Sequence, residues 1–367
     1  MKKNIPNKTF QFLKLISLLI LFFGFKANAQ KEVWKSDVIF YEDSLNDFYS
    51  SIAVDSTQIY FIANDYYVHA IDKKTGKTIW NYYLANKTNN SPKIFKNNIL
   101  VGKHISEYSN QCIQLNSKTG DTVQTLLISK IETEPLFKND VMYCTALNDG
   151  VGGVIMAYNL AENKIDWQQF IAHGVSTQPH FLKDKIVANA EADNWFEIGY
   201  DGVLKDTTCT YKATMFVESI PCVNNYEVLT PDEIQLNSDF LTSNLGEYEN
   251  FNQKVGEKIT VLMSDENLLI IGRNKKILQK INLSEISSIP KFEPNGYKDL
   301  IKIEDDFIWF FYQNQLFSYN YKINTMDKIY DVSKWKAHQL VLEIDNSMAW
   351  IISKNDAQLY GIQLNNK

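Results

Sequence analysis

Arginine is nearly absent from this chain. It occurs once, at Arg273, and the 37 basic residues are outnumbered by 43 acidic ones. Proteins that bind nucleic acid place clustered Lys and Arg against the phosphate backbone. This charge balance therefore argues against a nucleic-acid partner.

Cysteine and histidine are also scarce. The four cysteines include no CxxC and no adjacent pair, and the five histidines show neither HExxH nor HxH spacing. Structural metal sites and c-type haem attachment depend on such spacings. We therefore expect no metal, and we expect His69 and His180 to be ordinary hydrogen-bonded or surface residues. GxSxG is missing as well, and Gly152-Gly153 lacks the Lys-Ser/Thr of a phosphate loop.

Long apolar runs are missing after the first 25 residues. Residues 15–25 form an 11-residue apolar run that follows Lys2, Lys3, Lys8 and Lys14 and precedes Ala-Asn-Ala at 27–29. This pattern predicts a cleaved secretory signal over 1–29 and a mature domain over 30–367. Cleavage would remove five lysines and no acidic residue, so the formal net charge would change from −6 to −11. We expect an exported protein, periplasmic or extracellular, with no integral membrane segment after cleavage and, since no Cys follows the site, no lipid anchor.

Internal periodicity dominates the rest of the chain. Pro92, Pro135, Pro179 and Pro221 lie 43, 44 and 42 residues apart, and each opens two short apolar runs separated by turn residues. Asn and Asp tolerate the positive φ of tight hairpins. The sequence therefore predicts eight hairpins, at 51–63, 91–102, 134–144, 178–188, 220–230, 260–272, 300–311 and 340–352.

A second signature follows the hairpins. Residues 70–80 read AIDKKTGKTIW and residues 157–167 read AYNLAENKIDW, whereas Gln124 stands where a Trp is expected in the unit between them. The Asp/Asn position of this signature recurs along the chain, with the weakest assignments at Asp201 and Asn282. We place it at Asp72, Asn116, Asn159, Asp201, Asn237, Asn282, Asn320 and Asn365.

The two ends of the chain complete one another. The last residues, IQLNNK, stop where the second half of the signature should follow, and KEVW at 31–34 supplies that half. We expect residues 31–40 to form the outer strand of the last blade and close a ring, which removes an exposed edge. The predicted fold class is all-β: an eight-bladed β-propeller of four-stranded antiparallel blades, closed by the N-terminal strand.

The signature A-x-D-x-x-T-G-K-x-x-W at 70–80 resembles the repeat of the PQQ-like (pyrroloquinoline-quinone-type) β-propellers, among which the chain is BamB-like. The resemblance implies that Trp34, Trp80 and Trp167 dock on the neighbouring blade beside its Thr-Gly turn. It also implies a non-catalytic scaffold that binds another protein, with a role in cell-envelope or outer-membrane assembly. The quinoprotein dehydrogenases share the repeat, but we find no Ca²⁺ ligand set here and expect no cofactor.

Two alternatives remain open. One is a PQQ-dependent or other small-ligand-binding enzyme, and the other is an exported glycan-binding protein. For the leading hypothesis, a protein partner in the cell envelope, the candidate binding residues lie in loops between second and third strands, because loops on a rigid scaffold often carry recognition. They are Tyr108, Asp149, Asp193 and Trp195.

The cysteines fall at different expected depths in the ring. Cys112 is placed in a third strand, Cys144 in a second strand, Cys209 at a Trp position and Cys222 in a first strand. We therefore expect four buried free thiols that act as small apolar residues.

Overall fold

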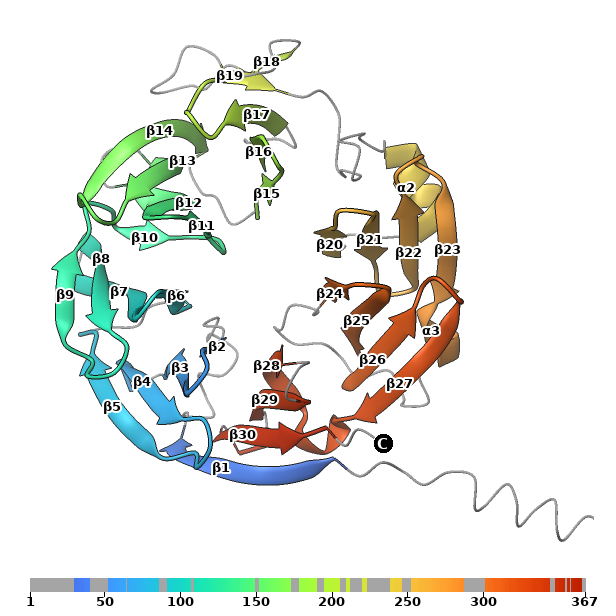
Figure 1. Cartoon of the computed structure of the whole chain (residues 1–367), viewed down its shortest axis with the longest axis horizontal. Helices are drawn as coiled ribbons and strands as arrows, with labels where there is room; N and C mark the ends of the chain where they lie inside the picture. Colours follow the sequence, from blue (N-terminus) through green and yellow to red (C-terminus); the bar gives the residue numbers. More distant parts are fainter. Residues whose placement is uncertain are drawn as a thin grey trace, which may run out of the picture.

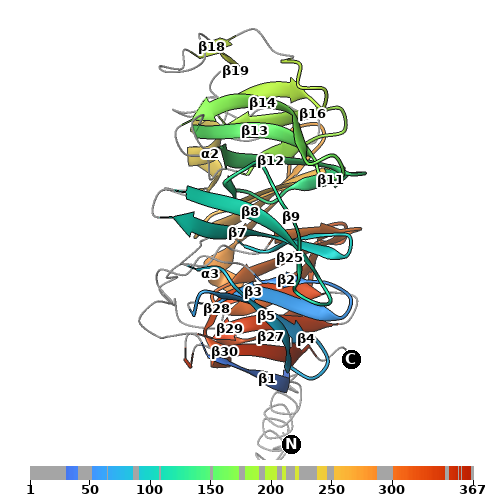
Figure 2. The same ribbon diagram turned by 90° about the vertical axis from the view of Figure 1, so that its left-hand side faces the viewer.

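The computed structural model describes residues 30–39, 52–63, 65–85, 91–106, 109–148, 152–172, 178–189, 195–204, 209–211, 220–222, 238–245, 252–286, 301–343, 347–353, 355–356 and 358–364. The expected signal segment, 1–29, lies outside these residues. The described strands form antiparallel sheets arranged around a centre, which is a β-propeller (Figure 1). Figure 2 shows the same ring edge-on as a disc.

The first half of the ring holds four blades. Blade 1 contains β2 (Ala53–Val54), β3 (Gln58–Ile62), β4 (Tyr67–Asp72) and β5 (Thr78–Tyr83). Blade 2 contains β6 (Lys93–Phe95), β7 (Asn98–Ser106), β8 (Ser109–Asn116) and β9 (Thr122–Thr125). Blade 3 contains β10 (Lys130–Ile131), β11 (Leu136–Lys138), β12 (Val141–Asn148), β13 (Gly152–Asn159) and β14 (Lys164–Ala172). Blade 4 contains β15 (His180–Phe181), β16 (Lys185–Asn189) and β17 (Trp195–Gly199).

The second half holds three blades and the irregular elements. Blade 5 contains β20 (Asn252–Val255), β21 (Ile259–Met263), β22 (Asn267–Gly272) and β23 (Ile277–Asn282). Blade 6 contains β24 (Ile301–Glu304), β25 (Phe307–Tyr312), β26 (Gln315–Asn320) and β27 (Thr325–Asp331). Blade 7 contains β28 (Ala337–Glu343), β29 (Met348–Ser353), β30 (Gln358–Gln363) and β1 (Lys31–Ile39). Outside the blades lie β18 (Cys209–Tyr211), β19 (Ile220–Cys222), α2 (Ser238–Leu245), α3 (Leu283–Ile286) and η2 (Ser333–Trp335).

The described residues form seven blades, so the prediction of eight was wrong. Val187 of blade 4 packs with Leu182 and with Val255 of blade 5, which makes these two blades neighbours in the ring. The fifth predicted hairpin, 220–230, should have stood between them, and its residues 223–230 lie outside the described residues. There the described residues supply only a two-stranded sheet, β18–β19, and the helix α2. A hairpin becomes a blade only when further strands pair with it and both of its faces are buried. The spacing of hairpins along the sequence does not predict this pairing or burial.

Blade 5 shows where the counting failed. In blade 1 the pair Gln58–Asp72 joins the second and third strands. The corresponding pair in blade 5, Asn267–Asn282, joins the third and fourth strands. The additional innermost strand is β20. Residues 238–240, which follow the predicted signature position Asn237, begin α2. Its Leu241 and Leu245 are buried against blade 5 because they lie four residues apart on one helix face.

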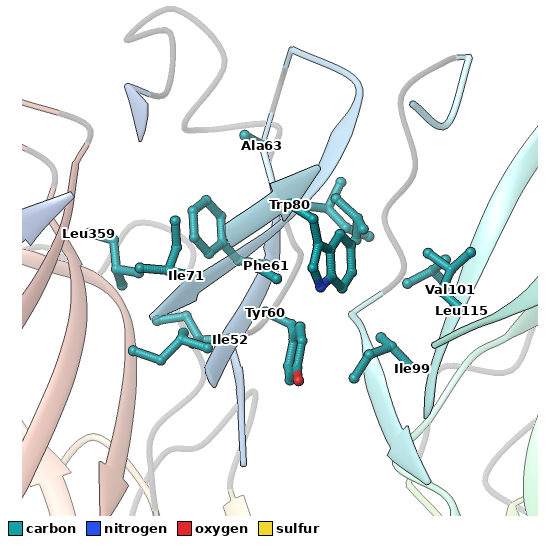
Figure 3. Packing of buried hydrophobic residues seen from close by; sticks show 14 of the residues in the cluster. Ile52, Tyr60, Phe61, Ala63, Ile71, Trp80, Ile99, Val101, Leu115 and Leu359 are labelled. Atoms are coloured by element: carbon teal, nitrogen blue, oxygen red, sulfur yellow. The ribbon is translucent and has the colours of Figure 1, made fainter. Parts of the chain in front are cut away.

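Burial explains the strand patterns. β3, β21 and β22 are buried at every position, because the middle strands of a blade are covered by neighbouring blades on both faces. The outer strand β5 alternates between exposed and less exposed positions, because one of its faces meets solvent. In Figure 3, Tyr60, Phe61 and Trp80 of blade 1 lie between Leu359 of blade 7 and Val101 of blade 2. The core is therefore a chain of inter-blade clusters.

The chain ends pair as the split signature predicted. β1 runs antiparallel to β30, with Trp34 opposite Gly361 and Lys31 opposite Gln363. Trp34 stacks on Trp350 with ring centroids 5.6 Å apart. Blade 7 is thus built from both ends of the described chain.

The tryptophans dock on the next blade as the resemblance implied. The indole N–H groups of Trp34, Trp80 and Trp167 donate to the backbone oxygens of Lys73, Ser117 and Tyr200, at 2.9, 2.8 and 3.0 Å. A Cβ added at Gly76 would lie 2.6 Å from the Trp34 ring, and one at Gly120 would lie 2.8 Å from the Trp80 ring. Glycine is needed at these turns for that close approach and for a φ of +73° and +75°.

The Asp/Asn position of the signature caps the segment that follows its strand. At six places its side-chain oxygen accepts a hydrogen bond from the backbone N–H two residues on, which is an Asx-turn; these are Asp72, Asn116, Asn159, Asp201, Asn282 and Asn320. The position paired like Asp72 in blade 4 is Gly199 rather than Asp201. Asn237 and Asn365 lie outside the described residues.

The cysteines separate into two pairs. Cys112 and Cys144 are free and buried in one cluster between blades 2 and 3, as expected. Burial raises the pKa of both thiols, that of Cys144 to about 12. Cys209 and Cys222 depart from the expected arrangement, because they are direct partners across β18 and β19 rather than residues at different depths of the ring.

Candidate protein-interaction face

The connections between second and third strands lie on one face of the disc, called here the loop face. In blades 2 and 3 the hairpins that reach it are long: β7 and β8 have 9 and 8 residues, against 5 and 6 for β3 and β4 of blade 1. β12 and β13 have 8 residues each. Figure 2 shows that β7 ends and β8 begins on the left-hand side of the disc. Blades 2 and 3 therefore present extended hairpins on this face.

The predicted binding residues fall on these connections. Tyr108, Asp149 and Asp193 lie outside the described residues, between strand ends that the structure places. Ser106 pairs with Ser109, and Asn148 pairs with Gly152. Trp195 is the first residue of β17 and pairs with Asn189. All three connections therefore belong to second-to-third-strand hairpins, which is the topological part of the prediction.

Blade 1 contributes an aromatic group to the same face that the sequence reasoning missed. We call Tyr66, Tyr67, Tyr82 and Tyr83 the tyrosine cluster. Tyr66 and Tyr83 are 39% and 50% exposed, which is high for such large side chains. Tyr67 pairs with Tyr83 across β4 and β5, and their ring centroids are 5.1 Å apart. The signal was present in the sequence as two Tyr-Tyr pairs, because neighbouring strand residues point to opposite faces and cannot both enter the core.

The backbone and the core hold the tyrosine cluster in place. Tyr66 has a φ of 67°, a left-handed conformation that is uncommon for a bulky residue. Its N–H donates to the Ala63 oxygen at 3.2 Å, and its own oxygen accepts from Leu84 N–H at 2.8 Å. In the core beside the tyrosine cluster, the ring of buried His69 stacks on Phe61. The Nε2 atom of His69 lies 2.9 Å from the Asp65 carboxylate. His69 is thus the hydrogen-bonded structural residue that we expected.

A cation joins the tyrosine cluster to blade 2. Lys103 of β7 donates to the Tyr82 hydroxyl at 3.0 Å and lies 5.1 Å from the centroid of its ring. Burial opposes ionisation of Tyr82, but hydrogen bonds from Thr122 and Lys103 outweigh it and lower the pKa of the phenol. Tyr82 therefore links blade 1 to the base of the long β7–β8 hairpin.

The inner rim of the loop face is cross-linked between blades 2, 3 and 4. Lys93 pairs with the Glu134 carboxylate. The Glu134 N–H donates to the Gln178 side-chain oxygen at 2.9 Å, and the Gln178 side-chain N–H donates to the Glu134 backbone oxygen at 3.0 Å. These bonds connect three neighbouring blades at the inner rim.

The opposite face, called here the turn face, carries the third-to-fourth-strand turns. A shallow pocket of about 410 Å³ lies there between blades 5 and 6. Its lining includes three cations, Lys258, Arg273 and Lys322, beside Tyr321 and Leu278. The Arg273 guanidinium donates to the Glu257 backbone oxygen at 3.0 and 2.7 Å. This basic pocket could receive an anionic small molecule.

The described residues contain neither a metal-ligand cluster nor a membrane-spanning helix. Among them, no three His, Cys, Asp or Glu side chains gather in a way that could hold a metal ion. Within the same residues, no helix has both the length and the apolar character needed to cross a membrane. The absence of a cofactor remains a prediction.

Comparisons with known proteins agree with the fold. A family model described as outer membrane protein assembly factor BamB, built on the PQQ-type repeat, matches residues 24–127 and 64–194. The matched part comprises blades 1 to 3 and the beginning of blade 4, where the signature is best preserved. The sequence matches no curated protein.

The solved structures that are similar to this chain have low sequence identity to it. The C-terminal WD40 domain of Sif2 is 11% identical, covers 92% of this chain and 99% of its own, and gives a TM-score of 0.56, a likeness of fold alone. BamB from Moraxella catarrhalis is 12% identical, with 87% and 84% coverage and a TM-score of 0.47. The computationally designed Ika8 protein is 10% identical, with 92% and 100% coverage and a TM-score of 0.49.

Proposed function

We propose, since this chain is a PQQ-like, BamB-like β-propeller, that it is a non-catalytic, exported scaffold that binds another protein of the cell envelope. The predicted signal over 1–29 supports export, and the family description supports an envelope location. A role in outer-membrane assembly is the more specific form of this proposal. Fold alone does not fix function, so the argument rests on the loop face.

The exposed tyrosine cluster is the observation that carries the proposal. Tyrosine is enriched at the centres of protein interfaces, because its ring buries a large apolar area while its hydroxyl can still find a partner. Here the rings are held by a defined turn, and Lys103 links Tyr82 to blade 2. Side chains that are already held in place lose little conformational freedom on binding, which favours affinity.

The test is crosslinking in the cell envelope of the native host. A tagged wild-type chain should capture a defined protein, and Tyr66→Ala with Tyr83→Ala should reduce that capture at least tenfold. A loss of about 1–2 kcal/mol at each contact corresponds to that factor. The matched control is Val203→Ala with Ile323→Ala, since these side chains are 59% and 67% exposed but lie in third-to-fourth-strand turns on the turn face.

Two results would count against the proposal. One is equal capture by wild type and the tyrosine variant, with both proteins folded. The other is a larger loss in the Val203/Ile323 control, which would move the interface to the turn face. Circular dichroism melting of each variant establishes folding, because exposed side chains contribute little to stability.

A small-ligand role is the second proposal, and the basic pocket of blades 5 and 6 favours it. Titration with PQQ and Ca²⁺ would support it if binding saturates and Arg273→Ala weakens it. No spectral change at micromolar PQQ would remove that ligand.

A further inference from the structure

The sheet β18–β19 brings two cysteines together that are distant in the predicted repeat. Its three Cα pairs are Cys209–Cys222, Thr210–Pro221 and Tyr211–Ile220. β19 also lies beside β17 of blade 4, so the small sheet is attached to the ring (Figure 1). Directly opposite residues of an antiparallel pair share one face of the sheet. The backbone therefore sets the two cysteines as cross-strand neighbours.

The backbone spacing suits a covalent link. Cys209 and Cys222 are directly opposite residues of an antiparallel pair. Such residues have Cα atoms about 4.5–5.5 Å apart. Disulfides join Cα atoms about 4.4–6.8 Å apart, most often near 5.5–6 Å.

We infer that Cys209 and Cys222 form a disulfide in the exported protein. It staples β18 to β19 at the place where the ring has no complete blade. The inference rests on export to an oxidising compartment, where such bonds persist. It does not depend on which surface binds a partner.

The other two cysteines provide an internal contrast. Cys112 pairs with Gly102 in blade 2, and Cys144 pairs with Met156 in blade 3. Neither faces a cysteine across a ladder. Both are buried, with 1% and 0% exposure, so an oxidant cannot reach them in the folded protein. They should remain thiols.

The chemistry is thiol–disulfide exchange. One thiolate attacks a sulfur of an oxidising disulfide, supplied by an oxidoreductase or a small-molecule disulfide of the compartment, and forms a mixed disulfide. The second thiolate then displaces the carrier. The two cysteine thiols lose two protons and two electrons as the S–S bond forms, and the oxidant gains them and leaves as two thiols.

Peptide mapping tests the inference directly. The full chain is isolated from its native host into denaturant with an alkylating agent, so that free thiols are trapped, and it is then digested with trypsin without reduction. Lysines place the four cysteines in separate peptides: 104–118, 139–164, 206–212 and 213–254. The expected product is a linked pair of 206–212 and 213–254, two hydrogens lighter than the sum of the reduced peptides, with Cys112 and Cys144 alkylated.

Variants make the result specific. Cys209→Ser should convert Cys222 to an alkylated thiol, and Cys222→Ser should do the same for Cys209. Cys112→Ala is the matched control and should leave the linked pair unchanged. Alkylation of all four cysteines, or a link to Cys112 or Cys144, would overturn the inference. Failure of the tyrosine variants to change partner capture would refute the proposed interface and leave this result untouched.

Discussion

The contact between Trp34 and Gly76 gives the sharpest test of how the ring is closed. Trp34 is 8% exposed, donates to the Lys73 oxygen at 2.9 Å and stacks on Trp350 at 5.6 Å. A buried Trp removes about 150–250 Å² from water, worth about 4–6 kcal/mol gross at about 25 cal/mol per Å². Truncations of this size cost about 3–5 kcal/mol. Since small domains are stable by only about 5–15 kcal/mol, Trp34→Ala should remove a large part of the stability.

Gly76 turns that expectation into a double-mutant cycle. Gly76→Ala places a methyl group 2.6 Å from the Trp34 ring at a φ of +73°, so it should cost about 1–3 kcal/mol for overpacking in addition to backbone strain. In the Trp34→Ala background the ring is gone and only the backbone strain remains. The two substitutions should therefore couple by about 1–3 kcal/mol, with the double variant more stable than the sum predicts.

Urea unfolding followed by circular dichroism measures each corner of the cycle, with the slopes compared so that a change in the unfolded state is detected. Val33→Ala is the control, since Val33 precedes Trp34 on β1 and is 50% exposed. It should change stability by less than about 0.5 kcal/mol. Additivity within about 0.5 kcal/mol, or a Trp34→Ala loss below about 1 kcal/mol, would refute this account of closure.

Two further predictions concern other blades. Gln124 stands where other blades have a docking Trp, and it donates to the Leu160 oxygen at 2.9 Å beside Asn163, where other turns have Gly. Gln124→Trp should therefore lower the free energy of unfolding by about 1–3 kcal/mol, because the indole collides with Asn163. Asn163→Gly in the same variant should recover part of this loss in urea unfolding. Burial, with a smaller effect of Lys254, lowers the pKa of His180 to about 4, so the folded protein resists its protonation. The contribution of neutral His180 to the free energy of unfolding should therefore be fully present above about pH 6.5 and should fall by at most about 3 kcal/mol toward pH 4. His180→Gln should flatten this dependence of stability on pH. An unchanged slope in the variant would exclude His180 as its source.

The docking of Trp34, Trp80 and Trp167 was predicted through the resemblance to the PQQ-like repeat. The pairing of β1 with β30 was predictable from the residues themselves, since each end of the chain carries one half of the signature. The tyrosine cluster was within reach of the sequence but was missed, because the search followed loops rather than strand ends. The loop residues Tyr108, Asp149 and Asp193 keep their standing as predictions.

The number of blades was not predictable from spacing. The sequence contains eight hairpin-like segments, but a segment forms a blade only when its sheet packs against a neighbouring sheet on each side. Between Tyr211 and Asn252 the described residues form a short sheet edge and a helix, and β20 joins blade 5 as an extra inner strand. Such a choice depends on contacts between segments far apart in the chain, which local patterns do not contain.

The sequence by itself determined the all-β class, the repeat and the closure by the N-terminal strand, because each follows from local chemistry repeated at a fixed interval. Only the tertiary structure decided the seven blades, the contact of Tyr67 with Tyr83 across β4 and β5, and the pairing of Cys209 with Cys222. The physical reason is that strand register and inter-blade packing are set by the whole ring closing at once, and a one-strand shift in a single sheet changes which residues meet.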